Sequence, residues 1–391
     1  MERRDRDAII LTGATGFLGR ELLWKLMLDA PAEQDILCLI REGQDGAGTA
    51  ATAAQRLERL MAEGSPLPAT DARRQRVLAI AGDITQPLLG QSQAQFAALA
   101  ARCVQIFHGA ATVRFDQPLA EAQRINVEGT RTMLQLALAA KQAGRLERFN
   151  YIGTAYVAGL RRGVVREDEL YTDQTFHNTY EQTKAQAEAL VREHLPGTPQ
   201  PLPVTLFRPS IIVGDSKSGY TSSFKVMYWP LKIFSRGLIP IVPAARGGRV
   251  DLVPVDYVVD AICALSKAPV AVGRCYHLAA GPQHETTIGA SMEQAAAFFY
   301  VYKPLLIDLA TFEKYVRPVL RLVLRGRRRQ ALDTGRVYVP YLNYQGSFDT
   351  QNARRDLAPF GLQVPDVSQY FERLLRYCVE SDWGKKQSSA R

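Results

Sequence analysis

Near its start the chain reads TGATGFLG (residues 12–19), directly after the apolar run AIIL (residues 8–11). Gly13, Gly16 and Gly19 stand three residues apart, and apolar residues then recur at helical spacing. Glycine lets a backbone turn tightly and lets a ligand come close to it. The free N–H groups at the start of a helix favour an anion there. The spacing differs from the common GxGxxG pattern, but its place after a first strand predicts a nucleotide-binding turn.

Composition and charge narrow the class of protein and its partners. The chain has 391 residues, of which 47% are apolar and 22% charged, as in an ordinary globular protein. The net charge of +9 favours anionic partners such as nucleotides, CoA-type thioesters, acidic carrier proteins and anionic membrane surfaces. The sequence has no zinc-ligand spacing and no aromatic–basic repeat, so we expect neither a metal site nor a nucleic-acid partner.

Cysteine usage and the lack of targeting signals indicate the cellular compartment in which we expect the protein. The five cysteines are scattered, mostly in apolar runs, and none forms a CxxC pair, which is typical of reduced core residues. No signal-peptide core follows MERRDRD (residues 1–7), and no uncharged apolar run approaches the ~20 residues of a membrane span. We therefore expect a cytoplasmic protein, soluble or peripheral to a membrane.

Strand-like and helical segments alternate along the first 215 residues. The strand-like runs are nearly continuous in apolar residues, as strands buried on both faces should be: AIILTG (8–13), DILCLIR (35–41), RVLAIAGDI (76–84), VQIFHGAA (104–111), RFNYIGTAYV (148–157) and VTLFRPSIIVG (204–214). Helical patterns include residues 126–144 and 178–195. This alternation predicts an α/β fold, a Rossmann-type doubly wound parallel sheet with helices on both faces.

The pattern changes after residue 215. Residues 253–268 predict a strand edge that leads into a helix, and residues 274–280 predict a further strand. From about residue 289 the sequence is mostly helical. We therefore expect a dinucleotide-binding domain over residues 1–215, with returns at about 250–280, and a smaller, mostly helical substrate-binding cap over residues 216–391.

The end of the second strand bears on the choice between NAD and NADP. There Arg41 stands in CLIREG, and its planar guanidinium suits a ribose 2′-phosphate. Glu42 follows and leaves NAD open, because a carboxylate at this place would hold the ribose 2′-hydroxyl. We favour NADP. In GDI (82–84), Asp83 could accept from the adenine amino group or act as a plain turn residue.

A tyrosine and a lysine suggest the chemistry. Tyr180 and Lys184 are four residues apart, so they share one face of a helix. A lysine one turn away, together with a positive nicotinamide ring, should lower the pKa of the phenol. Thr154, at the end of the fifth strand, could donate to the same substrate oxygen as Tyr180. A second copy of the spacing, Tyr228 and Lys232, contains a proline and follows no suitable strand, so we interpret it as coincidence.

Taken together, these motifs resemble those of the extended short-chain dehydrogenases/reductases. Within that group the chain is similar to the fatty acyl-CoA reductases and thioester reductase domains of the male-sterility-type NAD-binding family. The residues that carry the resemblance are TGATGFLG (12–19), GDI (82–84), FHGAATVRFDQPLAEAQRINVEGT (107–130), GTAYV (153–157), YEQTK (180–184) and FRPSIIVGD (207–215). The resemblance is good from about residue 8 to 280 and thin beyond.

The resemblance implies NADPH as cofactor and a catalytic triad of Thr154, Tyr180 and Lys184, the last two also touching the cofactor. It implies cofactor contacts from several segments: Gly13, Thr15, Gly16, Phe17 and Leu18 at the pyrophosphate and ribose, Arg41 at the 2′-phosphate, Asp83 and Ile84 at the adenine, and Ala110, Ala111, Pro209 and Ser210 at the nicotinamide half. Asn126 matches an asparagine that supports the lysine through water, and Gly153 departs from the family where a serine is expected.

The reaction implied is the reduction of a long-chain fatty acyl thioester, on CoA or an acyl-carrier protein, to an aldehyde and/or alcohol. One alternative is an extended dehydrogenase or epimerase that acts on a sugar- or sterol-type alcohol and prefers NAD. Another is a non-catalytic NADP sensor on the same fold. A preference for NAD would indicate the dehydrogenase or epimerase, and dinucleotide binding without turnover would indicate the sensor.

Two later segments leave their roles open. Residues 315–330 form a basic amphipathic pattern that could contact anionic lipid, CoA phosphates or a carrier protein, or could be a solvated face of a cap helix. Residues 222–234 are rich in aromatic and aliphatic side chains, which could line an acyl tunnel or pack the cap.

Overall fold

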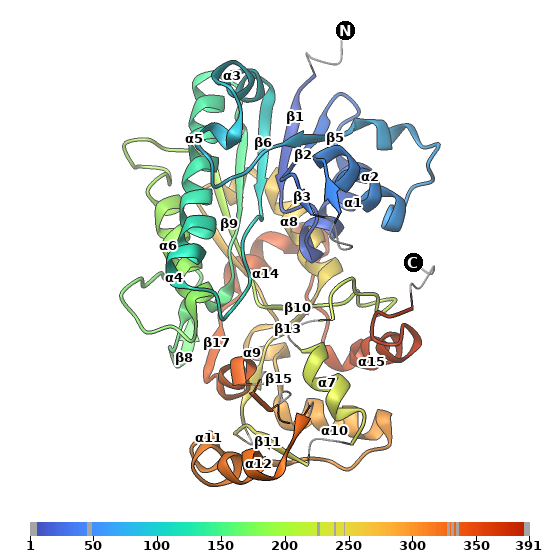
Figure 1. Ribbon diagram of the computed structural model, residues 1–391. Coiled ribbons are helices and arrows are strands. Elements are labelled where there is room, and N and C mark those ends of the chain that lie inside the picture. The colour runs from blue at the N-terminus through green and yellow to red at the C-terminus, as the bar shows by residue number, and fades with distance from the viewer. Residues whose placement is uncertain are drawn as a thin grey trace.

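A seven-stranded parallel sheet lies at the centre of the larger part of the molecule (Figure 1). The computed structural model describes residues 6–44, 49–224, 227–237, 240–245, 247–326, 329, 332–333 and 336–386. The strand order is β5-β2-β1-β6-β7-β9-β14, and each pair of neighbours is parallel. The strands are β1 (Ala8–Thr12), β2 (Asp35–Ile40), β5 (Val77–Ala81), β6 (Cys103–His108), β7 (Arg148–Ile152), β9 (Val204–Pro209) and β14 (Cys275–Leu278). The predicted fold class is confirmed.

Helices cover both faces of this sheet and divide its core in two. One core holds side chains of α1 (Phe17–Asp29), α2 (Ala53–Gly64), α8 (Val255–Lys267) and α14 (Gln351–Leu357), and the other those of α3 (Gln93–Arg102), α5 (Gly129–Gln142) and α6 (Thr179–Arg192). In β1, Ile9 and Leu11 belong to the first core, and Ala8 and Ile10 to the second. Because both faces of the strand are buried, its sequence is apolar throughout.

The strand order reverses between β1 and β6. The chain runs from β1 outward to β2 and β5, then returns to β6 and continues through β7 and β9 to β14. Thr12 at the end of β1 lies opposite His108 at the end of β6. In open α/β sheets ligands bind at the carboxyl ends of the strands where the order reverses, so the fold places the candidate site beside these two residues.

The observed strands end earlier than the sequence suggested, and the difference is largest in two of the runs. The run 148–157 ends as a strand at Ile152, because the Thr154 hydroxyl accepts the Tyr156 N–H (3.3 Å) and starts a 3₁₀ turn over Ala155–Ala158. The run 204–214 divides at Ser210, whose N–H donates to the Leu278 carbonyl (3.1 Å). The remainder, β10 (Ile211–Val213), pairs with β13 (Leu252–Pro254) in a separate parallel pair.

The rest of the chain forms helices and short strand pairs, in Figure 1 mostly below the sheet. The paired strands are β3 (Gly43–Gln44) with β4 (Ala50–Ala51), β8 (Gly163–Val165) with β17 (Gly346–Phe348), β11 (Ile241–Pro243) with β16 (Leu305–Ile307), and β12 (Arg249–Val250) with β15 (Thr286–Thr287). The helices are α4 (Leu119–Gln123), α7 (Tyr228–Phe234), α9 (Gly281–His284), α10 (Ile288–Phe299), α11 (Leu309–Thr311), α12 (Arg317–Val323) and α15 (Phe371–Glu380). The predicted domain boundary at residue 215 stays a prediction.

All five cysteines are buried and free. Among the described residues, no group of three or more His, Cys, Asp or Glu side chains could hold a metal ion. The same part of the chain contains no helix with the length and hydropathy needed to cross a membrane.

Candidate active site

The glycine-rich turn after β1 is closely packed. Gly13 has a φ of +80°, and its carbonyl accepts the Gly16 N–H (2.9 Å). A Cβ on Gly13 would lie 2.9 Å from backbone atoms of Gly109 and Ala110, and a Cβ on Gly19 would collide with the Gly13 carbonyl. Only glycine therefore satisfies both the left-handed backbone at residue 13 and the close approach of β1 to α1.

The N-terminus of α1 has the electrostatics of an anion site. Its N-cap residue, Gly16, has no side chain with which to accept the first N–H groups, and the first turn contains no acidic residue. The N–H groups of Phe17 and Leu18 therefore have no intrahelical acceptor. Thr15 and Gly16 are exposed at this turn. This arrangement fits the pyrophosphate of a dinucleotide.

A buried hydrogen-bond chain joins β1 to the helical segment before α5. The Thr130 hydroxyl donates to the Asn126 carbonyl (2.7 Å), so it accepts from Nε2 of His108 (3.0 Å). Nδ1 of His108 then accepts from the Thr12 hydroxyl (2.9 Å). Burial, and secondarily the charge of Lys184, lowers the pKa of His108 to about 3, so the imidazole is neutral.

The same threonine holds the turn after β6. The oxygen Oγ1 of Thr12 accepts the N–H groups of Gly109 (3.2 Å) and Ala110 (3.1 Å). This turn continues into Ala111, and both alanines are half-buried. Thr12 and His108 were not among the predicted site residues, although both lie in or beside quoted motifs.

The triad predicted from the sequence comes together at the carboxyl edge of the sheet. Thr154 follows β7, its hydroxyl donates to the Pro209 carbonyl (3.4 Å), and it lies close enough to the Tyr180 hydroxyl to lower the pKa of that phenol. Tyr180 lies in the first turn of α6, where the Asn178 side chain caps the helix by accepting the Glu181 N–H (3.0 Å). Thr154 is 5% exposed, so a substrate oxygen at this hydroxyl pair would be largely shielded from water.

The pKa of Tyr180 is expected to fall when a nicotinamide ring stands beside Lys184, and this stays a prediction. Burial raises it to about 12, against the hydrogen bond with Thr154, which lowers it. Lys184 is not among the main influences on the pKa of this phenol. Its Nζ donates to the Ile152 carbonyl (2.8 Å) and lies 4.4 Å from the centre of the Tyr151 ring. In this state Tyr180 is a protonated hydroxyl that can donate.

Lys184 is deeply buried. Burial lowers its pKa to about 7, and the carboxylate of Glu188, one helical turn further on, acts in the opposite direction. Lys184 therefore gains and loses its proton near neutral pH, as is typical of functional lysines.

The structure shows the contacts around Asn126 and Gly153, two residues that the resemblance singled out. Nδ2 of Asn126 donates to the Thr112 carbonyl (3.2 Å) and to the Thr183 hydroxyl (2.9 Å), while Oδ1 accepts the Thr112 N–H (2.8 Å). At Gly153, a Cβ would lie 3.3 Å from both the Phe207 carbonyl and the Tyr151 ring. A serine at residue 153 would therefore require its neighbours to shift slightly.

Two arginines lie at the expected adenosine end. Arg41 is exposed just beyond β2, and its carbonyl accepts a hydrogen bond from the guanidinium of Arg56 on α2. Arg56 was missed by sequence reasoning, because nothing in the spacing shows that α2 returns to the end of β2. Asp83 acts as a turn residue in the structure, since its Oδ1 accepts the Thr85 N–H (2.9 Å). The Ile84 side chain is 7% exposed.

The remaining predicted cofactor residues also lie at strand ends. Pro209 is the last residue of β9, and Ser210 follows it with 7% of its surface exposed. Like Ala110 and Ala111 after β6, they follow or end strands of the parallel sheet. Their contact with a cofactor stays a prediction.

Aromatic rings from distant segments surround Tyr180. Phe115 lies 5.9 Å from the Tyr180 ring and 5.3 Å from that of Tyr341, measured between centroids. Tyr341 also meets Tyr156 edge-on at 5.1 Å, and its hydroxyl donates to Oε1 of Glu181 (2.7 Å). No sequence signal pointed to Tyr341, which is 161 residues away from Tyr180 along the chain (341 − 180).

The second Tyr-x₃-Lys copy has structural contacts. The Tyr228 hydroxyl accepts the Gly214 N–H (2.7 Å), and Lys232 lies over the Trp383 ring at 5.9 Å. These contacts anchor α7 to the C-terminal helix region. Residues 225 and 226 of the apolar segment 222–234 lie outside the described residues.

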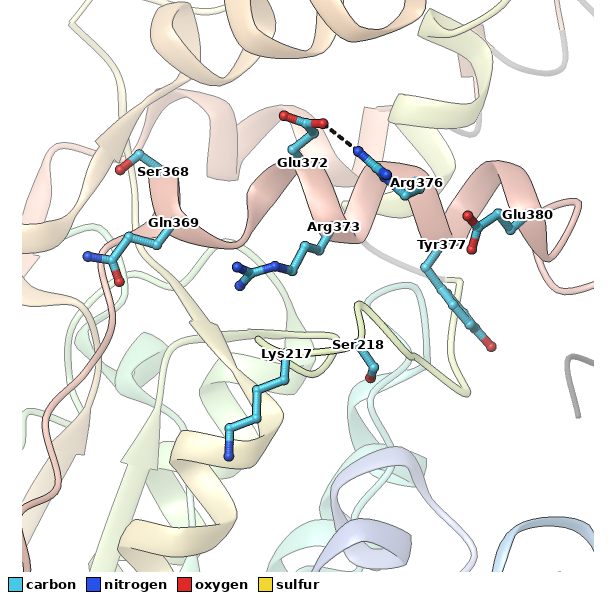
Figure 2. A pocket seen from close by; sticks show the side chains of 9 residues that line it. All are labelled: Lys217, Ser218, Ser368, Gln369, Glu372, Arg373, Arg376, Tyr377 and Glu380. Carbon is cyan, nitrogen blue, oxygen red and sulfur yellow. Dashed lines mark hydrogen bonds and ion pairs between the residues drawn. The ribbon is translucent and has the colours of Figure 1, made fainter. Parts of the chain in front are cut away.

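A polar groove of about 420 Å³ lies between the loop after β10 and α15 (Figure 2). Lys217, Arg373 and Arg376 contribute positive charge, and Glu372 pairs with Arg376 at 2.8 Å. The groove also contains Glu380, so its charges are mixed. None of its residues belongs to the triad or to the glycine-rich turn, and we assign it no part in the reaction.

The parallel sheet, the glycine-rich turn where the strand order reverses, and the Tyr-x₃-Lys helix define an extended short-chain dehydrogenase/reductase with a nicotinamide dinucleotide site. Residues 11–262 match the sequence model of the NAD-binding family described as "Male sterility protein". This match spans more than half of the chain, and the chain belongs to that family.

Similar proteins include a fatty acyl-CoA reductase and a peptide synthetase. Over 285 residues the chain is 32% identical to "Fatty acyl-CoA reductase 1" of Rattus norvegicus, covering 64% of this chain and 53% of that protein. It is 29% identical over 375 residues to "Nonribosomal peptide synthetase asaC" of Aspergillus flavus, covering 90% of this chain and 34% of that protein. The chain thus spans about half of the first relative and about a third of the second.

A solved structure extends the likeness over nearly the whole chain. It is the terminal R domain from the myxalamid PKS-NRPS biosynthetic pathway, with a TM-score of 0.79 and 28% identity. The match covers 97% of this chain and 92% of that domain. The fold of this chain, its C-terminal part included, is therefore similar to that of the R domain.

Proposed function

We propose that the protein is an NADPH-dependent reductase of long-chain acyl thioesters, on CoA or an acyl-carrier protein, that forms fatty aldehyde and/or fatty alcohol. The observation that carries the proposal is the proximity of the Thr154 and Tyr180 hydroxyls at the carboxyl edge of the sheet, where Thr154 is buried and Tyr180 is half-buried. The names of the relatives, fatty acyl-CoA reductase above all, support a thioester as the substrate.

The residues of the site suit this chemistry. When bound, NADPH supplies a hydride to the thioester carbonyl carbon, and the carbon–sulfur bond then breaks to release the thiol and leave an aldehyde. Thr154 and Tyr180 would donate to the carbonyl oxygen, where negative charge develops, and such preorganised donors stabilise the transition state. With a pKa of about 12, Tyr180 carries its proton at neutral pH and can give it to an aldehyde oxygen in a second reduction.

Lys184 and the glycine-rich turn would hold the cofactor. The Lys184 ammonium lies in the same helix one turn after Tyr180, within reach of a ribose placed along the edge of the sheet. The uncapped N-terminus of α1 would hold the pyrophosphate, at Gly13, Thr15, Gly16, Phe17 and Leu18. Asp83, Ile84, Ala110, Ala111, Pro209 and Ser210 would line the remainder of the cofactor.

We also propose that residues 216–391 form the substrate-binding part of the protein, apart from the strand and helix that return at about 250–280. Tyr341 supports this division, because it brings an aromatic ring and a hydroxyl from that region to the neighbourhood of Tyr180. The Nδ2 group of Asn178 donates to the Tyr341 hydroxyl (2.8 Å), so this contact is anchored to the start of α6.

The first experiment measures NADPH oxidation with palmitoyl-CoA and, separately, with hexadecanal, and identifies the products of both. Oxidation that depends on the thioester is the expected result, and hexadecanol among the products would show that both reductions occur. Tight NADPH binding without turnover of either substrate would overturn the proposal and favour another alcohol substrate or a sensor.

Arg41→Ala tests the choice of NADPH. A guanidinium hydrogen-bonded to a phosphate contributes about 1.5–3 kcal/mol, so the KM for NADPH should rise about ten- to hundredfold. Steady-state kinetics with both cofactors provide the measurement, and NADH, which lacks the 2′-phosphate, is the control. Equal losses with NADH and NADPH would contradict a contact between Arg41 and the 2′-phosphate. Arg56→Ala should repeat the pattern, because Arg56 lies beside Arg41.

A further inference from the structure

The helical stretch that follows β16 turns an apolar face outward. It is continuous from Leu309 to Val323 through α11, a π-helical turn and α12. The exposed side chains stand at i, i+4, i+7 and i+8, which is one face of a helix: Tyr315 (59% exposed), Val319 (57%), Leu322 (81%) and Val323 (71%). Phe312, one turn before Tyr315, is buried. In most surface helices the apolar stripe is buried against the core, whereas here an apolar stripe is exposed.

The segment just before this helix adds further exposed apolar side chains. Tyr300 and Tyr302 are 96% and 98% exposed, and Leu305 is 57% exposed. A hollow of about 550 Å³ lies beside Leu305, between the start of α10 and residues 303–306. Seven of the sixteen exposed large apolar side chains in the described part of the chain fall within residues 300–323. Such clustering marks an interaction surface rather than ordinary scatter.

Basic side chains accompany this apolar face. From residue 300 to 325 the chain carries five basic residues and two acidic ones. Lys314 and Arg321 are exposed and stand at i and i+7, so they follow one edge of the apolar stripe, and Arg321 also pairs with Asp333 at 3.5 Å. Arg325, also exposed, follows the end of α12. Glu313 is already paired with Arg317 at 2.7 Å. Of the predicted basic segment 315–330, residues 327, 328 and 330 lie outside the described residues.

We propose that this apolar–basic face, made of the exposed side chains of residues 300–325, binds the surface of an anionic lipid bilayer. Exposed tyrosines and aliphatic side chains suit the interface between headgroups and acyl chains. Lysines and arginines beside them suit anionic headgroups. In Figure 1, α11 and α12 lie at the lower end of the molecule, away from the sheet. The proposal holds whatever reaction the site performs, because binding needs no turnover.

Vesicle sedimentation with the full chain tests the proposal. We expect binding to an equimolar mixture of phosphatidylcholine and phosphatidylglycerol, weak binding to phosphatidylcholine alone, and weakening as salt is added. The double variant Leu322→Asp/Val323→Asp should lower the partition coefficient at least about tenfold, since it removes apolar contact and adds negative charge. Both side chains are exposed, so the fold should tolerate the change. Val270→Asp, at an exposed valine in the 3₁₀ turn before β14, is the matched control.

Several outcomes would overturn the proposal. The chain could fail to sediment with anionic vesicles, or it could sediment equally with both kinds of vesicle. The double variant could also bind as well as the wild-type chain. A loss of oligomers in light scattering with Leu322→Asp/Val323→Asp, without vesicle binding, would assign the face to a second copy of the chain. Capture of an acidic carrier protein in place of vesicles would assign it to that partner. NADPH oxidation with a short, water-soluble acyl-CoA, measured in parallel, tests the proposed function independently of all these results.

Discussion

Tyr180→Phe is expected to lower kcat for thioester reduction by about 10²- to 10⁴-fold, the usual contribution of a positioned proton donor. The substitution removes a hydroxyl that lies beside that of Thr154 and keeps the ring that packs near Phe115. The dissociation constant for NADPH, measured by cofactor fluorescence, should stay within about twofold, because a phenylalanine preserves the shape of the site. Near-wild-type turnover would show that another group donates to the carbonyl oxygen.

The chain contains its own control for this experiment. Tyr228→Phe removes the tyrosine hydroxyl of the second Tyr-x₃-Lys copy, which accepts the Gly214 N–H. Loss of that hydrogen bond should cost about 1 kcal/mol of stability and leave the chemical step unchanged. If both variants lost activity to the same degree, the effect would reflect the fold and not the chemistry of Tyr180.

Much of the fold could be predicted because the relevant signals are local. Strands buried on both faces must be apolar throughout, as Ala8 to Leu11 show, and such runs are visible without knowing their partners. The glycines of the first turn were equally visible in the sequence. The structure shows why residue 13 is glycine, since a Cβ there would collide with the backbone of Gly109 and Ala110. Strand ends were overestimated, because a side chain such as that of Thr154 ends β7 through a hydrogen bond that composition does not reveal.

The parts of the site that could not be predicted depend on contacts across long stretches of chain. Arg56 meets Arg41 because α2 returns to the end of β2, and Tyr341 meets Glu181 from the far end of the sequence. The expected fall in the pKa of Tyr180 depends on Lys184 together with a bound nicotinamide ring, and it stays a prediction. In the protein alone this pKa is not lowered. Instead it rises, since burial depends on everything that packs around the ring.

A buried ion pair supports the helix that carries Tyr180 and Lys184. Glu188 is one turn beyond Lys184, and its carboxylate makes two hydrogen bonds with Arg208 of β9, at 2.9 and 2.7 Å. Both side chains are fully buried, and Arg192 adds a second partner at 2.8 Å. Nε2 of His277 accepts a hydrogen bond from Arg208 (3.2 Å), since Nδ1 donates to the Asp349 carbonyl. The pair thus joins α6, β9 and β14 beneath the site.

Glu188→Gln is expected to lower the free energy of unfolding by about 3–5 kcal/mol, because it leaves the Arg208 charge buried without its counter-ion. Urea denaturation followed by circular dichroism is the measurement. In the wild-type chain, Arg208 and Arg192 outweigh burial and lower the pKa of Glu188. This stabilisation is therefore present above the ordinary carboxyl pKa of about 4.3 and is lost as the pH falls through the lowered value. The variant should lack that acid-dependent loss.

An exposed pair with the same geometry as Glu188 and Arg192 is the control for this prediction. Glu372 and Arg376 are also four residues apart on a helix and also 2.8 Å from one another, but their side chains are 59% and 62% exposed. Glu372→Gln should therefore cost no more than about 1 kcal/mol. A cost for Glu188→Gln as small as that for Glu372→Gln would mean that Arg208 finds sufficient compensation in the carbonyl groups of Glu167 and Glu169, to which it also donates. The larger cost would instead show that the helix carrying Tyr180 and Lys184 is fixed to the sheet by the Glu188 carboxylate itself.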